Sequence, residues 1–444
     1  MKIVMLTPGT GSYHCGVCMR DNALAREMIR QGHHTVMLPM YLPLTLDEDA
    51  ASPDTPIFFG GISTWIREKI PFLRRMPRWL DRALSKRWLL KLVAGKAAKT
   101  GGPELAGMTI SMLRGEEGNQ AAEIEELVTW LRGAFEGKKP DAIWLSTALQ
   151  AGLARRLRVE LGVPVIGFLQ GEDTFLDALG PKSPEVWRLL AERMCDADAW
   201  VAPSRYFADL MSQRLGWDAS TTAERIRVIP NGVALGEYPR DTGKQRPSVP
   251  TIGYLARFVP GKGIGLLVEA FIRLRQRMPE VRLRCAGSMT ADDRIYVDKL
   301  QARLRAVGAD QAVEWLPNVS LDEKIAFLKS LTVFSVPATY SEAFGQYVLE
   351  AMATSTPVVL PRASAFPEIV ESTGGGELFE LDRSESQSAE NLSNALEGLL
   401  RRPDDAKSMG AKGRAAIERD LSMTRLAERL IELTSSFSAV PTPR

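Results

Sequence analysis

The sequence is poor in cysteine and has no long apolar run, and both absences limit what the chain can be. Four cysteines in 444 residues are too few for a disulfide scaffold. No segment approaches the ~18 consecutive apolar residues of a membrane-spanning helix. The N-terminal run MKIVMLTPG is too short for a signal sequence and is typical of a first strand. We therefore expect a cytoplasmic protein.

An excess of charge of one sign is also missing, because 56 Lys and Arg residues oppose 54 Asp and Glu residues. A net charge of +2 gives no general attraction to nucleic acid, so we expect no nucleic-acid partner. What remains is an ordinary globular composition, with 45% hydrophobic and 25% charged residues. A chain of this length and composition is long enough for two or three domains.

Short apolar segments with strand character alternate with helical segments along most of the chain. This alternation favours parallel sheets that are covered by helices on both faces. We therefore predict an α/β fold with two doubly wound, Rossmann-like domains. The predicted strands form two series, at 2–8, 34–41, 141–146, 163–170 and 198–204, and then at 251–258, 281–287, 312–317 and 332–338.

The two series set the expected domain boundaries. We place the first domain at residues 1–225 and the second at 226–415. A C-terminal helix at about 416–438 is expected to pack back on the first domain. Residues 44–138 interrupt the regular alternation and are interpreted as a helical insertion in the first domain.

The insertion contains a strongly basic stretch at 67–99. Eleven Lys and Arg residues stand there against two acids, Glu68 and Asp81. A basic amphipathic helix with tryptophan can lie on an anionic membrane surface. The alternative is a helix that packs on the sheet and leaves its basic face in water. The stretch therefore leaves peripheral contact with an anionic membrane open.

Two glutamates stand eight positions apart in SEAFGQYVLE, residues 341–350. The apolar run before them ends at Pro337 and predicts a buried strand, whereas QYVLEAMA is compatible with a helix. Glu342 therefore falls in the loop after a strand, and Glu350 falls in the helix that follows. Ligands of open α/β sheets bind at such carboxyl ends, and N–H groups at a helix start suit an anionic or polyhydroxyl ligand. Either glutamate alone could instead be a solvated surface acid.

The segment GYLARFVPGKGIG places two cations after another predicted strand. Arg257 ends the strand, and Lys262 follows between two glycines. Cations at a strand-to-helix turn, with glycines that allow close backbone approach, suit a diphosphate. The segment is not a P-loop, because Gly263 and not Ser or Thr follows the lysine. The alternative is two solvated cations on an ordinary loop.

Three segments in this order resemble glycosyltransferase family 4: IRVIPNGV, GYLARFVPGKG and VPATYSEAFGQYVLEAMATSTPVV. In the N-terminal half, GVCMRDNALAREMIRQGHHTVML looks like the family's glycine turn and helix, and WVAPSRYFADLM looks like its Pro-Ser strand end. The resemblance covers most of the chain outside 44–138. It implies a GT-B fold, in which two Rossmann-like domains face a central cleft, and retaining transfer from a nucleotide sugar.

The resemblance also implies roles for the charged residues. Arg257 and Lys262 would hold the donor diphosphate and stabilise the leaving-group charge as catalytic residues, together with Glu342. Glu342 and the backbone N–H groups that follow it would hold the donor sugar and the distal phosphate, and Glu350 would accept hydrogen bonds from the ribose. The remaining residues implied on the donor side are Gly11, Gly16, Val319, Ala343, Phe344, Gly345 and Leu349.

The chain departs from the family pattern at two places. Many members carry a histidine after the strand that corresponds to VIGFLQGED, and Gln170 stands there instead. Glutamine can hydrogen-bond a sugar hydroxyl but does not titrate near neutral pH, so a binding role fits and an acid–base role does not. Ala234 replaces the usual aspartate after Asn-Gly-Val. The residues implied on the acceptor or sugar side are His14, Arg20, Gln170 and Asp173.

The motif Cys15-x-x-Cys18 admits three interpretations. Such a pair can bind metal or cycle between thiol and disulfide, but a zinc site needs about four ligands and the other two cysteines lack a pairing spacing. A redox pair needs a helix start that stabilises the thiolate, which this position can supply. The third interpretation is two small residues in a substrate-binding turn.

The leading hypothesis is therefore a metal-independent glycosyltransferase that uses a nucleoside-diphosphate sugar, with UDP or GDP as the expected nucleotide. Its expected partners are that donor, as co-substrate, and a hydroxyl acceptor, and no further cofactor is expected. Two alternatives remain open at this point. One is a GT-B protein that binds sugar nucleotides without turnover, and the other is a membrane-peripheral transferase that acts on a lipid-linked acceptor.

Overall fold

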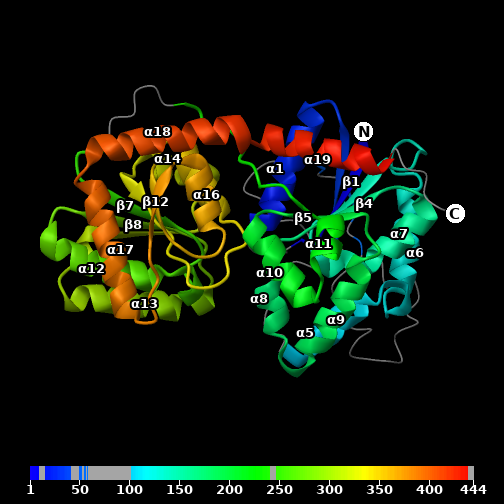
Figure 1. Cartoon of the computed structure of the whole chain (residues 1–444), viewed down its shortest axis with the longest axis horizontal. Coiled ribbons are helices and arrows are strands. Elements are labelled where there is room, and N and C mark those ends of the chain that lie inside the picture. The colour runs from blue at the N-terminus through cyan, green and yellow to red at the C-terminus, as the bar shows by residue number, and fades with distance from the viewer. Residues whose placement is uncertain are drawn as a thin grey trace. The chain divides into compact units, whose positions relative to one another are not determined.

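The computed structural model describes residues 1–9, 16–41, 50–52, 55, 56, 58, 102–240 and 247–438. The chain divides into two compact units (Figure 1). Unit 1 consists of Met1–Ile229 and Leu426–Arg444, and unit 2 consists of Pro230–Arg425. Among the described residues, no helix is both long enough and apolar enough to cross a lipid bilayer.

Unit 1 is built on a parallel sheet of six described strands, in the order β2-β1-β3-β4-β5-β6. The central strands β3, β4 and β5 are buried along their whole length, as expected for a sheet with helices on both faces. The strands are β1 (Lys2–Thr7), β2 (His34–Pro39), β3 (Ala142–Leu145), β4 (Val165–Phe168), β5 (Ala199–Ala202) and β6 (Ile226–Val228).

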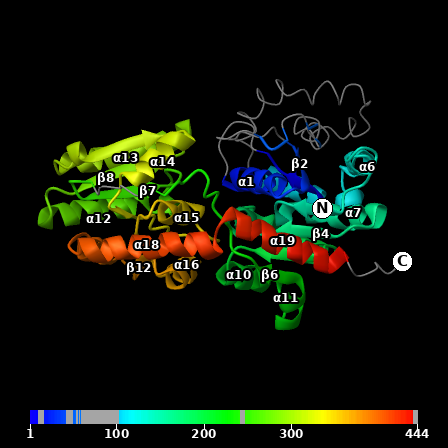
Figure 2. The ribbon, with the colours of Figure 1, turned by 90° about the horizontal axis from the view of Figure 1, so that it is seen from above.

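The helices of unit 1 connect successive strands and cover the sheet. They are α1 (Gly16–Arg30), α5 (Gly102–Leu113), α6 (Ala121–Leu131), α7 (Ala154–Leu161), α8 (Glu172–Asp177), α9 (Ser183–Met194), α10 (Arg205–Leu215), α11 (Ala219–Arg225) and α19 (Met423–Ser438), with short 3-10 turns η2 (Gly115–Glu117), η3 (Ala148–Leu153) and η4 (Gly180–Lys182). Helix α19, red in Figure 2, is fixed to the sheet because Trp144 of β3 donates from Nε1 to the Thr434 hydroxyl at 3.2 Å.

Unit 2 repeats this architecture, with a parallel sheet of six described strands in the order β12-β11-β10-β7-β8-β9. The chain starts in the middle of the sheet at β7, winds outward to β9 and then returns to β10. The strands are β7 (Thr251–Leu255), β8 (Arg282–Gly287), β9 (Val313–Pro317), β10 (Val333–Phe334), β11 (Val358–Pro361) and β12 (Gly376–Phe379).

Helices cover this second sheet as well, with α12 packed along α17, and with α15 and α16 packed against α18. They are α12 (Ile264–Arg277), α13 (Ala291–Ala306), α14 (Leu321–Lys329), α15 (Gln346–Ala353), α16 (Phe366–Thr373), α17 (Glu385–Leu400) and α18 (Pro403–Asp420), with 3-10 turns η5 (Pro260–Lys262) and η6 (Asp310–Ala312). The α/β class and the two doubly wound sheets predicted from the sequence are thus confirmed.

Several boundaries differ from those expected. Helix α1 begins at Gly16, which is its exposed first residue. Unit 1 extends to Ile229, beyond the expected boundary at 225, because β6 pairs with β5 as the last strand of the first sheet. Within 44–138, the described helices α5 and α6 belong to unit 1, and the basic stretch 67–99 lies outside the described residues.

Candidate functional site

The two predicted cations of unit 2 lie at the carboxyl edge of its sheet, in the loop after β7. This loop approaches the loop after β10 so closely that side chains would not fit at its glycines. A Cβ at Gly263 would collide with the backbone oxygen of Pro337, and a Cβ at Gly261 would collide with the ring of Tyr340. Gly263 also has φ of +73°, a left-handed conformation that favours glycine. The two loops therefore form one packed structure.

Lys262 and Glu342, which are 80 residues apart in sequence, form an ion pair between these loops. Their side chains are 17% and 12% exposed. Tyr347 donates its hydroxyl to Glu342 Oε2 at 2.7 Å. The ammonium lies 5.0 Å from the ring centroid of Tyr340 and 5.1 Å from that of Tyr347, within the range of cation–π attraction. An acid, a base and two aromatic rings thus converge where the sequence predicted donor binding.

Burial acts against the charge of Lys262, and its neighbours act in favour of it. Desolvation alone would lower the pKa of the ammonium, but the Glu342 carboxylate and the Tyr340 side chain outweigh it, so the pKa of Lys262 is raised. The same carboxylate adds to the effect of burial on Tyr347, whose pKa is raised well above its ordinary value. Lys262 is therefore a fixed positive charge at neutral pH, and Tyr347 is a fixed hydrogen-bond donor.

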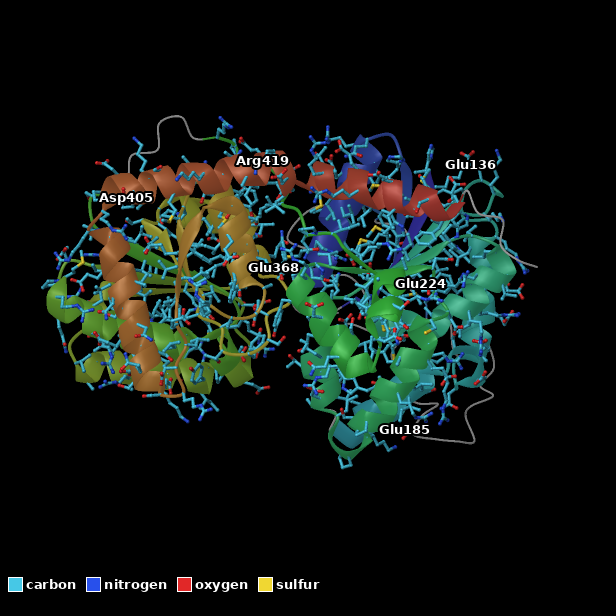
Figure 3. All side chains as sticks on the ribbon, viewed as in Figure 1. Glu136, Glu185, Glu224, Glu368, Asp405 and Arg419 are labelled. Atoms are coloured by element: carbon cyan, nitrogen blue, oxygen red, sulfur yellow. The ribbon has the colours of Figure 1, made fainter. Side chains whose placement is uncertain are left out.

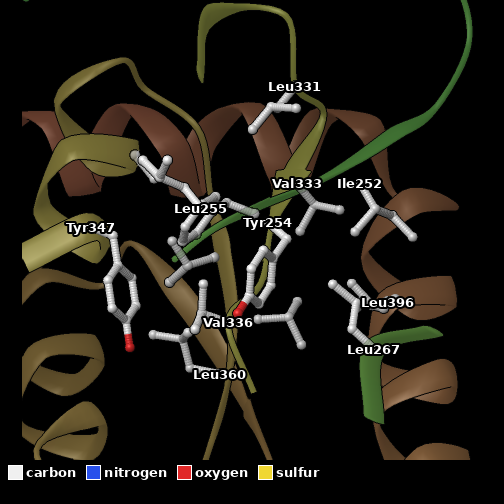
Figure 4. Packing of buried hydrophobic residues seen from close by; sticks show 14 of the residues in the cluster. Ile252, Tyr254, Leu255, Leu267, Leu331, Val333, Val336, Tyr347, Leu360 and Leu396 are labelled. Atoms are coloured by element: carbon white, nitrogen blue, oxygen red, sulfur yellow. The ribbon is translucent and has the colours of Figure 1, made fainter. Parts of the chain in front are cut away.

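Two tyrosines of the unit 2 core fasten the site loops (Figure 4). Tyr254 of β7 donates its hydroxyl to the backbone oxygen of Arg257 at 3.0 Å, and Tyr347 of α15 holds Glu342. Both rings pack among buried apolar residues such as Leu255 and Val336. A polar group at the end of a large apolar ring gives the loops a rigid attachment to the core.

Arg257 also lies at this edge, and its side chain is 50% exposed. Its guanidinium forms two hydrogen bonds with Asp293 of α13, from Nε to Oδ2 and from Nη2 to Oδ1, both at 3.1 Å. Asp293 also accepts from the backbone N–H and the hydroxyl of Thr290, which closes a capping box at the start of α13. One carboxylate thus caps a helix and orients the candidate diphosphate-binding arginine.

Glu350 projects from α15 and is paired with a lysine that the sequence reasoning did not single out. Lys324 Nζ of α14 lies 3.0 Å from Glu350 Oε1, and both side chains are mostly buried. Helix α15 begins at Gln346, and Gly345 just before it has φ of +89°, a conformation that favours glycine. Ala343 and Phe344 before it are buried, and Val319 is half-buried in the segment after β9.

Leu349 is the donor-side residue that the structure separates most clearly from the others. It is fully buried and belongs to the apolar core of unit 2. The Asn-Gly-Val segment lies against the same helix, because Gln346 donates from Nε2 to the backbone oxygen of Gly232 at 2.9 Å. Leu349 therefore supports the site from the core side.

The carboxyl edge of the unit 1 sheet carries a second cluster, and it is buried. Arg20 of α1 is paired with the adjacent Asp21, and the Arg20 side chain is 4% exposed. Asp21 also accepts from the hydroxyls of Thr7, at the end of β1, and Ser146, which follows β3. Charged groups usually stay at the surface, as Glu136, Glu185 and Asp405 do in Figure 3. A buried ion pair that ties α1 to two strand ends is therefore unusual.

Gln170 and Asp173 lie at the next strand end of unit 1, after β4. The Gln170 side chain meets the Arg20 guanidinium, while its backbone N–H donates to Glu172 Oε2 at 2.7 Å. Glu172 is buried, which raises the pKa of its carboxyl, and hydrogen bonds from Gln170, Ala148 and Thr147 oppose that rise. Asp173 is buried in the first turn of α8. Arg20 and Gln170, which the sequence placed on one side, are thus in direct contact.

Some predicted residues fall outside the described part of the chain, namely Gly11, His14, Cys15 and the basic stretch 67–99. Cys18, the second cysteine of the motif, is buried in α1. Within the residues that are described, no group of three or more His, Cys, Asp or Glu side chains is arranged to hold a metal ion.

Sequence reasoning placed Asp21 beside Arg20 on the acceptor side, and the structure shows it buried and paired with Arg20. It missed Asp293 and Lys324. Asp293 carried a clearer signal, because Thr290-x-x-Asp293 has the spacing of a capping box before a helix. Nothing in the sequence pairs Lys324 with Glu350.

Two family models match the chain, and together they cover most of it. Residues 19–232 match the model described as "Glycosyl transferase 4-like domain", and residues 240–416 match "Glycosyl transferases group 1". The second match contains Arg257, Lys262, Glu342 and Glu350, and the first contains Arg20 and Gln170.

Curated relatives are similar over part of the chain. An alpha-maltose-1-phosphate synthase of Mycolicibacterium smegmatis is 29% identical over 229 residues, which are 49% of this chain and 58% of that protein. A trehalose synthase of Thermococcus litoralis is 30% identical over 43% of this chain and 45% of its own length. A phosphatidyl-myo-inositol mannosyltransferase of Mycobacterium tuberculosis is 30% identical over 46% and 52%. The chain spans about half the length of the curated relatives it matches.

Solved structures share the fold over nearly the whole chain at low sequence identity. A sucrose-phosphate synthase from Thermosynechococcus elongatus superposes with a TM-score of 0.69 at 17% identity, covering 99% of each chain. The Anabaena protein HepE, solved in complex with UDP, gives a TM-score of 0.68 at 16% identity over 98% of this chain and 100% of its own. These similarities establish the GT-B fold.

Proposed function

This chain belongs to the glycosyltransferases that combine a 4-like domain with a group 1 domain, and on that premise we propose that it is a retaining hexosyltransferase. It would move a sugar from a nucleoside-diphosphate sugar, with UDP or GDP as the nucleotide, to a hydroxyl acceptor. The diphosphate would be held by Arg257 and Lys262 without a metal ion. The UDP bound by the structural neighbour HepE supports a nucleotide-sugar donor.

The observation that carries this proposal is the buried position of Lys262. In the reaction, the bond between the anomeric carbon and the β-phosphate oxygen breaks, and its electron pair stays on the diphosphate. A positive charge held in a mostly buried site stabilises that developing negative charge more than a solvated lysine would. Glu342 and the tyrosine rings fix the ammonium before the donor arrives, so little reorganisation is needed during the reaction.

The acceptor hydroxyl would attack the same face of the sugar from which the diphosphate leaves. Its oxygen forms the new bond to the anomeric carbon, and its proton passes to an oxygen of the leaving phosphate. No carboxylate of the protein needs to attack the sugar in this scheme. Positioning and charge stabilisation then supply most of the rate enhancement.

Arg257 and Glu350 would complete the donor contacts. Arg257 is half exposed and already oriented by Asp293, so it can offer its remaining N–H groups to a phosphate oxygen. Glu350, with Oε1 held by Lys324, would accept hydrogen bonds from the ribose hydroxyls. The N–H groups after Glu342, in the segment that leads into α15, would face the sugar and the distal phosphate.

A two-stage experiment tests the function. Melting temperatures are first measured with UDP, GDP, ADP and their glucose and mannose derivatives, because a ligand that binds the native state stabilises it by mass action. Turnover is then assayed with the donor that gives the largest shift. We expect one nucleotide to be selected and Glu342→Gln to lose at least 100-fold in turnover, while the control Glu377→Gln, which breaks an ordinary surface ion pair with Arg402, does not.

Three outcomes separate the proposals. Binding and turnover that depend on Glu342 support the transferase. Binding of a nucleotide sugar without turnover would support the non-catalytic alternative. Absence of any shift in melting temperature would overturn nucleotide-sugar binding altogether.

A lipid-linked acceptor is a second candidate, supported by the eleven basic residues of 67–99 and by the name of the mannosyltransferase relative. Sedimentation with vesicles containing 30% phosphatidylserine tests it. Membrane contact is favoured if the protein binds these vesicles at low salt, does not bind neutral vesicles, and is released at 0.5 M NaCl. Salt would release it because it screens the attraction between basic residues and anionic lipids. Absence of binding to either vesicle type would favour a soluble acceptor, and equal binding to both would show that the basic residues do not cause the contact.

A further inference from the structure

We propose that Arg20 is a positioning residue that holds the side-chain oxygen of Gln170, so that Gln170 presents only its NH2 group, as a fixed donor, to a sugar hydroxyl oxygen. This inference rests on the proposed function and concerns the carboxyl edge of the unit 1 sheet. In this proposal Arg20 does not contact the acceptor itself, and it affects ligand binding by orienting Gln170.

Arg20 is held on several sides and is not available as a mobile surface cation. Its Nε donates to Asp21 Oδ1 at 3.0 Å, and Nη2 contacts the same oxygen. The guanidinium carbon lies 4.7 Å from the ring centroid of Phe168, the last residue of β4. Asp21 in turn accepts from the hydroxyls of Thr7 and Ser146. The guanidinium is therefore fixed by α1 and by the ends of three strands.

The guanidinium decides which way the Gln170 amide faces. An amide has an oxygen that only accepts and a nitrogen that only donates, and the two are assigned from their partners. Both Nη1 and Nη2 of Arg20 point at the same end of the Gln170 side chain. Because a guanidinium has donors and no acceptor, that end must be Oε1. The amide nitrogen then faces away from Arg20.

This orientation leaves Gln170 with one function toward a ligand. Its backbone N–H is held by Glu172 and its Oε1 is held by Arg20, so its amide nitrogen is the side-chain group that faces away from Arg20. The side chain is half-buried, so Nε2 can reach a ligand at the strand end. An NH2 group binds an oxygen lone pair, as a sugar hydroxyl offers, and it keeps this property at every pH at which the protein is folded.

A double-mutant cycle tests whether Arg20 acts through Gln170. Gln170→Met removes the amide at similar size, and Arg20→Lys keeps the charge beside Asp21 but removes the planar fork that meets Oε1. We expect each variant to lower kcat/KM about tenfold with UDP-glucose, or with whichever sugar nucleotide of the panel is turned over. The double variant should be no worse than Gln170→Met alone, because the two residues form one unit.

The control is Arg193→Lys, which alters another buried arginine of unit 1 that is paired with Glu117 and Asp196. It should change the melting temperature but not kcat/KM, with or without Gln170→Met. If the effects of Arg20→Lys and Gln170→Met multiply to about 100-fold, the two residues act independently and the inference is wrong.

A second measurement needs neither turnover nor a known donor. In protein labelled with ¹⁵N at glutamine side chains, the Gln170 NH2 signal is identified as the one that Gln170→Met removes. A charged partner on Oε1 strengthens the double-bond character of the amide C–N bond, so we expect Arg20→Lys to shift this signal and Arg193→Lys to leave it in place. An unchanged signal in Arg20→Lys would overturn the contact itself.

The two measurements separate this inference from the proposed function. If the wild-type enzyme transfers no sugar, or if Glu342→Gln keeps full activity, the proposed function fails and the amide signal still decides whether Arg20 orients Gln170. If the enzyme is active and depends on Glu342 but the cycle is multiplicative, only the role of Arg20 fails.

Discussion

Each unit carries an ion pair beside an aromatic ring at the carboxyl edge of its sheet, and the two clusters differ in how they are built. In unit 2, Lys262 pairs with Glu342 beside two tyrosine rings, and the partners come from loops 80 residues apart. In unit 1, Arg20 pairs with the adjacent Asp21 beside the ring of Phe168. Both pairs follow strand ends at the carboxyl edge, where α/β sheets bind ligands.

The difference lies in what each pair leaves available. The side chains of the unit 2 pair keep a small exposed fraction, and Tyr347 holds Glu342 from the core side through a hydrogen bond. The charges of this pair can therefore act on a ligand directly. The unit 1 pair is buried, accepts from strand-end hydroxyls and contacts the side chain of Gln170. One edge thus presents charge, and the other uses charge to orient a neutral amide.

The largest effect is expected from breaking the unit 2 pair. Lys262→Met and Glu342→Gln should each lower kcat/KM by at least 100-fold. Each should also cost about 2 kcal/mol of stability, because removal of one partner leaves a mostly buried charge uncompensated. The double variant should regain part of the stability and none of the activity. Urea unfolding and steady-state kinetics measure both, and a double variant that recovers activity would contradict the roles assigned to the pair.

The main expected effect of breaking the unit 1 pair is a loss of stability. Asp21→Asn leaves the Arg20 charge buried and removes the acceptor of two hydroxyls, so we expect a loss of about 3 kcal/mol in the free energy of unfolding. Glu136→Gln, on the surface of the same unit, is the control and should change stability by less than about 0.5 kcal/mol. An Asp21→Asn variant as stable as the control would show that the two clusters do not differ in the way described.

The contact between Arg257 and Asp293 gives an intermediate case, in which an acid orients a cation that is still half exposed. Arg257→Ala should lower kcat/KM by about 50-fold through loss of a charge-assisted contact to the donor. Asp293→Asn should lower it about fivefold, because the arginine is less well oriented.

The matched control for Asp293→Asn is Glu323→Gln. Glu323 occupies the same place in the capping box of α14, with Ser320 as its partner, and no arginine of the described residues is paired with it. Both variants should lower the melting temperature by a similar amount, since each weakens one helix cap. Equal kinetic effects of the two variants would mean that capping, and not the orientation of Arg257, explains the loss.

The smallest effect is expected at the ion pair between Arg240 and Glu418 on the surface of the protein. It provides a contrast with the two buried clusters. Hydrogen bonding to Arg240, and then to Arg414, lowers the pKa of Glu418 from 4.5 to about 2. Because the folded-state pKa lies below the unfolded value, the stabilisation is present above pH 4.5 and is lost as the pH falls toward 2. Arg240 is 68% exposed, so we expect less than ~1 kcal/mol after screening by solvent.

Melting temperatures of Glu418→Gln and the wild type test this prediction between pH 7 and pH 2. The difference should shrink on acidification and should also shrink at 0.5 M NaCl at neutral pH. A difference that stays the same at pH 2 would show that charge does not produce the effect.

The sequence was sufficient to predict the fold class because its signals are local. Apolar runs such as VIGF and TIGYL, separated by glycine and proline, set the strands, and the parallel order then brings their following loops to one edge. Placement of Arg257, Lys262 and Glu342 after strands followed from the same pattern. The segment QYVLEAMA, predicted to be compatible with a helix, is helix α15.

The pairing within the site could not be predicted in this way. Lys262 meets Glu342, Glu350 meets Lys324 and Arg20 meets Gln170 through tertiary contacts that span 80, 26 and 150 residues. Periodicity carries no information about such distances.

The close packing of the loop after β7 against the loop after β10 limits how this protein could be redesigned. Gly261 and Gly263 flank Lys262, and neither has room for even a methyl group. In a random library made to change donor preference, we expect nearly every variant with a substitution at either glycine to be inactive, whatever other substitutions it carries. Diversity is better introduced at Val319, which lies on another segment and where a side chain is already accommodated.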